Sequence, residues 1–235
     1  MTVRERVLPA PDLYAVCPLR GPILPFYEGV FEAAYIILNP FMRPRPSSVG
    51  PSVEMMADLS ADKLCRAYEP VSWAQILELS GLPSLASIDV ALRTAIGGLN
   101  AQHANKENAA LLDVSLKRHG LLPPCEGLFP ELMQDPMLSF MQSLDQDWAW
   151  VGDDVGTERK LHWIDDLKPA SAKHHLVRAS VFTPDKTSLW TVHWDSHFSL
   201  FCSTQENIAR LAEHPGLEGF ACDTSTEIYW GVPAA

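Results

Sequence analysis

One short stretch, TVHWDSHFSLF at residues 191–201, carries the side chains of this protein best suited to chemistry. Polar and apolar residues alternate along it, which predicts a single β-strand over residues 189–202. His193, Asp195 and His197 then share one face of that strand, because successive side chains point to opposite faces. The opposite face carries the apolar residues that we expect in the core: Trp190, Val192, Trp194, Phe198 and Leu200.

The preceding stretch, HHLVRASVF at residues 174–182, predicts a second strand that a short turn joins to the first. The hydrophobic pattern sets the register of an antiparallel pair, and here it favours Phe182 opposite Leu189. The same register brings His174 and Arg178 opposite members of the polar row, whereas a slip of one residue would mix polar and apolar side chains on both faces. The sequence therefore predicts one polar patch, made of His174, Arg178, His193, Asp195 and His197.

Two histidines and a carboxylate of this patch have the composition of a metal site. Asp195 and His197 would be about 6.7 Å apart along the strand, and His174 would be about 5 Å across from His197. His193 would be about 13 Å from His197, too far to share one ion comfortably. The predicted ligands are therefore His174, Asp195 and His197, a set that suits Zn²⁺ or Fe²⁺ with open coordination positions. In the alternative, this face is solvated or contacts a partner through Arg178 and His193, and Arg178 pairs with Asp195 across the strands.

The elements that must position this patch change in character along the chain. Residues 1–58 predict a proline-rich, irregular arm and one short helix, and residues 59–122 predict a helical region. Residues 148–232 predict short antiparallel strands interrupted by one helix. We therefore expect an α+β fold in a single domain over residues 1–235, with an N-terminal helical half packed on a C-terminal antiparallel β-sheet.

Local signals make some of these elements specific. EGVFEAAYIILN, residues 28–39, predicts the short buried helix of the first region. Ser72 followed by Gln75 is a capping box that predicts the start of a helix. Ser203 is the expected cap of the helix that interrupts the sheet, and TEIYWGV, residues 226–232, is the last predicted strand.

Charge narrows the classes of partner. The net charge is −11, which argues against nucleic acid and against an anionic membrane, because both attract lysine and arginine. Residues 126–170 contain ten acidic residues and only three basic ones. This segment is either a solvated face or a surface for a basic protein, and Asp153, Asp154, Asp165 and Asp166 are its candidate binding residues.

Three tryptophans, Trp148, Trp150 and Trp163, lie within the acidic segment. Such residues are usually core, but tryptophans beside carboxylates also form protein-binding surfaces. The five cysteines are scattered and odd in number, and the first residues do not form a signal peptide. We therefore expect a soluble protein of the reducing cytoplasm.

The C-terminal third of the chain resembles the YwbB-like proteins, a bacterial family of unknown function. The resemblance lies in Trp194-Asp195, in LEGFAC at residues 217–222 and in the closing TEIYW. It supplies no catalytic residues. In size, acidity and general layout the chain is also similar to bacterial toxin-immunity proteins.

These observations favour a non-enzymatic binding or inhibitor-like protein that needs no cofactor and recognises a basic protein. The alternative is a metal-dependent hydrolase or oxygenase centred on His174, Asp195 and His197, with Zn²⁺ or Fe²⁺ bound.

Overall fold

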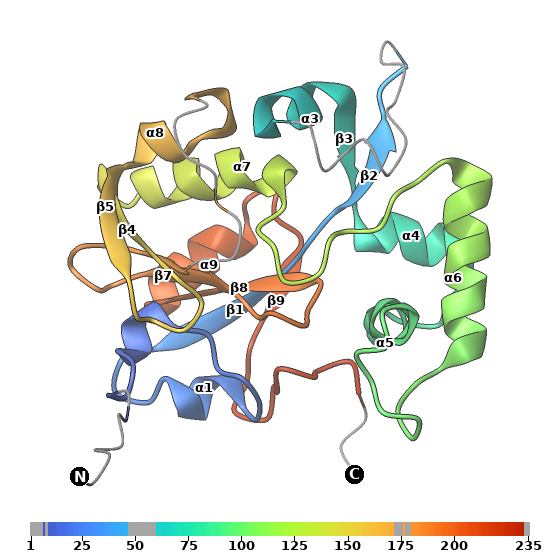
Figure 1. The fold of residues 1–235 in the computed structure, drawn as a ribbon, viewed down its shortest axis with the longest axis horizontal. Helices are drawn as coiled ribbons and strands as arrows, with labels where there is room; N and C mark the ends of the chain where they lie inside the picture. The colour runs from blue at the N-terminus through green and yellow to red at the C-terminus, as the bar shows by residue number, and fades with distance from the viewer. Residues whose placement is uncertain (1–6, 8, 47–59, 172–175, 177–179, 233–235) are drawn as a thin grey trace, which may run out of the picture.

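The centre of the molecule is a seven-stranded sheet (Figure 1). The computed structural model describes residues 7, 9–46, 60–171, 176 and 180–232. The order of the strands is β5-β4-β6-β7-β8-β1-β9, and every neighbouring pair is antiparallel. The strands are β1 (Ala33–Leu38), β4 (Trp148–Gly152), β5 (Arg159–Trp163), β6 (Ser180–Phe182), β7 (Leu189–Val192), β8 (Phe198–Ser203) and β9 (Gly219–Ala221).

Strand β1 comes from the segment predicted to be a helix, so that prediction is wrong. All six of its residues are buried, and it pairs with β8 on one side and with β9 on the other. Alternate residues enter two different cores, Ile36 in one and Tyr35 in the other. A strand covered on both faces is a continuous apolar run, which periodicity alone cannot distinguish from a buried helix.

Helices cover both faces of the sheet. One face packs against α4 (Trp73–Ser80), α5 (Leu85–Ala95) and α6 (Lys106–His119), so the predicted helical region covers a face as expected. The other face packs against α7 (Glu131–Gln142), α8 (Ile164–Leu167) and α9 (Gln205–Ala212). The fold is α+β as predicted, but the centre of the sheet has no solvated face on which a polar row could lie.

Local signals identified helix starts well. The capping box of α4 is present, with Ser72 accepting from the Gln75 amide at 3.1 Å. The cap of α9 is Thr204 and not the predicted Ser203, because Ser203 ends β8 and its hydroxyl group is 2.9 Å from that of Ser188.

The remaining elements surround this core. A two-stranded sheet joins β2 (Phe41–Pro44) to β3 (Tyr68–Val71), next to α3 (Ala61–Ala67), while η1 (Leu13–Ala15), α1 (Ile23–Phe26) and η2 (Pro169–Ser171) are single short turns of helix. The stretch TEIYWGV forms turns instead of the predicted last strand. Within the described residues, no helix has the length and apolar character needed to cross a bilayer.

Candidate functional site

The His-x-Asp-x-His row lies in a turn and not on a strand. The predicted pairing of Phe182 with Leu189 is confirmed, but the expected long strand is divided into β7 and β8, which pair with each other across residues 193–197. The Ser196 hydroxyl closes the turn by donating to the His193 carbonyl at 2.9 Å. Trp194, expected in the core, is 50% exposed. The expectation of one strand failed because the polar residues of the turn continue the alternation of polar and apolar residues in the two flanking strands.

The turn inverts the expected faces, because all three polar side chains of the row are buried. The His193 Nδ1 atom accepts from the Asp195 amide at 3.2 Å. Nε2 therefore carries the proton and donates to the Leu19 carbonyl at 3.1 Å. Burial lowers the pKa of His193, so the ring is neutral and both of its nitrogens are occupied. His193 is buried, so the structure gives no support to the predicted contact of His193 with a partner.

Asp195 belongs to a buried ionic network that sequence reasoning missed. Arg93 on α5 is fully buried and its Nε atom lies 3.0 Å from Oδ2 of Asp89, four residues earlier. The Arg93 Nη1 group donates to the Asp195 carbonyl, and its distance to Asp195 Oδ2 is 3.9 Å. The Tyr229 hydroxyl donates to the same carboxylate oxygen at 3.2 Å. Two carboxylates thus surround one guanidinium.

The same arginine ties the C-terminal segment to the turn. Its Nη2 atom donates to the Ile228 carbonyl at 3.2 Å, and its Cζ lies 4.6 Å from the centre of the Tyr229 ring. Burial raises the pKa of Asp89 to about 6, against the opposing effect of Arg93. The cluster of Asp89, Arg93 and Asp195 thus contains two carboxyl groups and one guanidinium group.

His197 has a strongly lowered pKa. Burial, followed by the positive charge of Arg93, lowers its pKa to about 4. Its Nδ1 atom is buried and has no hydrogen-bond partner among the described residues, and the same is true of the side-chain Oδ1 atom of Asn39. The backbone N–H of Asn39 donates to the His197 carbonyl at 3.1 Å.

The predicted metal site is not supported. His174 and Arg178 lie outside the described residues, so the structure does not test their positions. Asp195 is committed to Tyr229 and lies beside a guanidinium that would repel a cation. Among the described residues, no group of three His, Cys, Asp or Glu side chains is placed to hold one ion.

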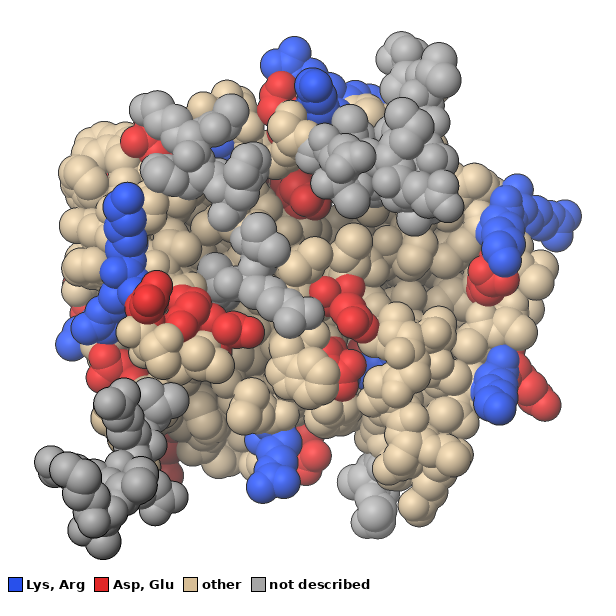
Figure 2. All heavy atoms as spheres, in the orientation of Figure 1, with Lys and Arg blue, Asp and Glu red and all other residues tan. Residues whose placement is uncertain are grey.

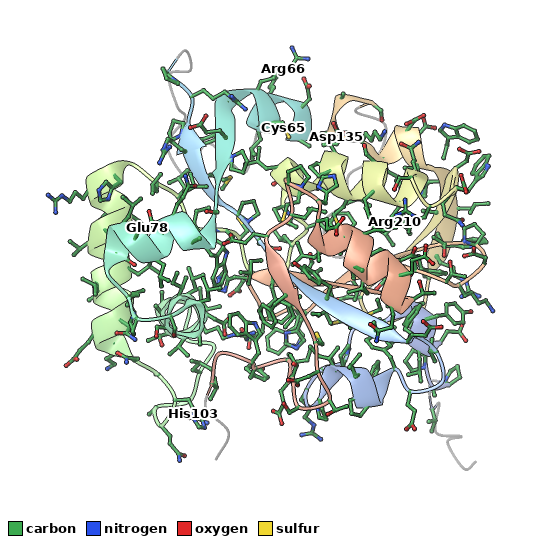
Figure 3. The ribbon with its side chains drawn as sticks, turned by 180° about the vertical axis from the view of Figure 1, so that it is seen from behind. Cys65, Arg66, Glu78, His103, Asp135 and Arg210 are labelled. Atoms are coloured by element: carbon green, nitrogen blue, oxygen red, sulfur yellow. The ribbon has the colours of Figure 1, made fainter. Side chains whose placement is uncertain are left out.

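A pocket lies on the solvent side of this network. It has a volume of about 910 Å³ and lies between the loop after α5, strand β9 and residues 225–232. Its lining includes Gly98, His103, Phe220, Tyr229 and Trp230. Figure 3 shows His103 on the loop after α5, at the end of the molecule where the C-terminal segment lies. Gly98 is in contact with the buried network, because a Cβ atom there would be 2.6 Å from Asp195 Oδ1.

The predicted acidic residues lie near the opposite edge of the sheet, in the turn between β4 and β5 and on α8. Asp154 is exposed. Asp153 braces the β4–β5 turn by accepting from the Thr157 amide at 2.7 Å, and Asp165 lies 3.1 Å from Lys168 Nζ. Figure 2 shows acidic and basic atoms together on this side, whereas most of the visible face is uncharged. Of the four, Asp154 is therefore the best placed to meet a partner.

Two of the three tryptophans in the acidic segment are exposed. Trp148 and Trp163 are directly opposite each other on β4 and β5, and their rings meet edge to face with centres 4.9 Å apart. They are 44% and 39% exposed, and Leu161 beside them is 39% exposed. Trp150 packs against the core, as expected of most tryptophans. The helices α4–α6 lie at the other end of the molecule from β4 and β5 (Figure 1).

The residues that sequence reasoning missed left a weak signal. Asp89 and Arg93 have the spacing of a helical ion pair, yet they lie among Ile88, Ala91 and Leu92, which belong to the core. A charged pair within an apolar stripe indicates a buried pair. Nothing in the pattern indicates that Tyr229 joins it, because that contact depends on the tertiary fold.

Comparison with known proteins agrees with the resemblance in the sequence. The family described as "Protein of unknown function (DUF2711)" matches residues 20–232, which extends the likeness beyond the C-terminal third. The chain is similar to the uncharacterized protein YwbB of Bacillus subtilis, strain 168, with 23% identity over 161 residues, 68% of this chain and 71% of that protein. No solved structure shows a significant match.

Proposed function

Since the chain belongs to the DUF2711 family of proteins of unknown function, we propose a function from its own surface: it binds a basic protein through the edge formed by β4 and β5. The observation that carries this proposal is the exposed Trp148–Trp163 pair at the end of the sheet. An aromatic pair that is rigid before binding loses little entropy on binding, and tryptophan is enriched among residues that dominate binding energy.

The charge around the pair supports a basic partner. Residues 145–168 contain seven acidic and three basic residues, a net charge of −4, and the whole chain has a net charge of −11. Complementary charge accelerates encounter and excludes wrong partners, while the apolar pair supplies the binding energy. Strand β5 is also an end strand of the described sheet, and on one side it has no neighbouring strand among the described residues, which supports this edge as the binding site.

The proposal includes a cytoplasmic location and no cofactor. All five cysteines are free, and Cys17 and Cys202 are buried thiols, which suits a reducing compartment. His193 and Ser196 form hydrogen bonds within the β7–β8 turn, and the proposal therefore places binding on the exposed edge of the sheet instead.

The test begins with capture of proteins from the lysate of the source organism and purification of a basic candidate. Trp148→Ser with Trp163→Ser should weaken its affinity by at least about 2 kcal/mol, or about 30-fold, if the pair is the energetic centre. Asp147→Asn with Asp154→Asn should instead slow association at low salt, and this difference should shrink near 0.15 M salt, where the screening length is about 8 Å.

A matched control removes the same charge elsewhere: Glu107→Gln with Glu213→Gln changes two acidic residues on α6 and after α9. These variants should bind like the parent. A captured protein whose affinity is unchanged by loss of both tryptophans would refute the proposal, because its contact must then lie on another surface.

A further inference from the structure

The pocket beside the buried network has the size and lining of a small-molecule site. Its volume of about 910 Å³ falls within the range of ligand pockets in proteins, roughly 300–1,000 Å³. Two regions line it: the loop after α5, and strand β9 with the C-terminal segment that follows it. Because these two regions are far apart in sequence, the pocket exists only in the folded protein.

Aromatic rings form a fixed wall of the pocket. Phe220 and Trp230 meet edge to face with ring centres 5.0 Å apart. Trp230 also lies 6.3 Å from the buried ring of Trp73, and Tyr229 is anchored through its hydroxyl to Asp195. Rings held in this way present their π faces and edges without further ordering, which favours cations that approach the ring face.

The charged side chains around the pocket also favour a cation. Among the described residues, its lining contains Glu227 and no lysine or arginine, and His103 is the one basic side chain. Directly behind Tyr229 and Gly98 lie two buried carboxylates, Asp89 and Asp195, that share the single charge of Arg93. Three carboxyl groups around the pocket therefore accompany one guanidinium group, and the low dielectric of the interior reduces screening between such groups.

From this geometry we infer that the pocket binds a small organic cation, an alkylammonium or quaternary ammonium compound. The aromatic wall contacts the alkyl groups of the ammonium, and Glu227 and the buried network balance its charge. This site is independent of the protein-binding edge, because β9 and β5 are the two opposite end strands of the sheet. Failure of one proposal therefore leaves the other intact.

The experiment compares three probes of nearly the same shape: choline, its neutral carbon isostere 3,3-dimethyl-1-butanol, and the anion 3,3-dimethylbutanoate. Titrations follow tryptophan fluorescence and heat of binding at low ionic strength. Choline should saturate at least about tenfold more tightly than the neutral isostere, a difference of about 1.4 kcal/mol, and the anion should not saturate. Equal binding of choline and the isostere, tighter binding of the anion, or no saturation by choline or the larger benzyltrimethylammonium would overturn the inference.

Substitutions of residues that line the pocket test whether choline binds there. His103→Lys adds a positive charge and should abolish choline binding, whereas His103→Gln should preserve it. Glu227→Gln should weaken choline severalfold and leave the neutral isostere unchanged, while Glu213→Gln, outside the lining, should change neither. Choline binding that survives both His103→Lys and Glu227→Gln would assign the cation to another site and refute the inference.

Discussion

Replacement of Arg93 by methionine tests whether the buried network holds the fold together. Methionine fills much of the same space but removes every donor. Asp89 then loses its counter-ion in the core, and the carbonyls of Asp195 and Ile228 lose their donor. Removing one partner of a buried pair costs about 3–5 kcal/mol, and an unsatisfied buried acceptor costs about 1–3 kcal/mol. Because Asp89 can take up a proton, we expect a total loss of about 3–5 kcal/mol at pH 7.

The chain offers a closely matched control. Asp62 and Arg66 on α3 have the same i, i+4 spacing and the same 3.0 Å separation as Asp89 and Arg93, but the Arg66 side chain is 78% exposed. Arg66→Met should therefore cost no more than about 0.5 kcal/mol. Urea unfolding followed by circular dichroism measures both losses under the same conditions.

A second substitution distinguishes the cost of the unpaired Asp89 carboxylate from the cost of altered packing at residue 93. In the Arg93→Met background, Asp89→Asn removes the uncompensated carboxylate and should restore about 1–3 kcal/mol. The loss in Arg93→Met alone should also be smaller at pH 5 than at pH 7.5, because Asp89 is protonated at the lower pH. A loss within about 1 kcal/mol of that in Arg66→Met, or no rescue by Asp89→Asn, would show that the network contributes little to stability.

Two further predictions follow from the turn. The pKa of His197 is about 4 in the folded protein and near 6.5 when unfolded, so the unfolded state binds more protons between these values and stability falls as pH decreases from 6.5 to 4. His197→Asn should reduce that fall by up to about 1.4 kcal/mol per pH unit, measured from urea midpoints, and an equally steep fall in the variant would contradict this. Trp190→Ala should cost about 3–5 kcal/mol, because the ring is fully buried, and Trp194→Ala less than about 1 kcal/mol. If urea unfolding showed equal losses of stability in the two variants, the assignment of Trp190 to the core and of Trp194 to the surface would be refuted.

The sequence predicts what depends on local pattern and fails where two structures share one pattern. The register of Phe182 with Leu189 is correct, because only that pairing keeps apolar residues together. The turn at residues 193–197 was mistaken for strand because its polar residues continue the alternation of β7 and β8. Asp195 and Ser196 are turn-forming types, and this composition was the available signal.

The role of Asp195 could not be predicted in the same way. Its partners come from α5 and from the C-terminal segment, and neither lies near it in sequence. The pairing depends on helices covering both faces of the sheet, which turns a row of polar residues from a solvated surface into part of the interior. Sequence periodicity indicates which side chains share a face, but not what covers that face.

Burial also decides what this row can do. A general base must come within about 2.6–3.2 Å of a substrate atom. The two ring nitrogens of His193 are occupied, and His197 is buried and kept neutral by its lowered pKa. The proposed binding sites lie instead at the two ends of the sheet: a tryptophan pair in an acidic segment at one edge, and an aromatic pocket beside Asp89, Arg93 and Asp195 at the other. Both ends combine aromatic rings with acidic side chains, and the two proposed partners, a basic protein and an organic cation, carry the charge that would pair with them.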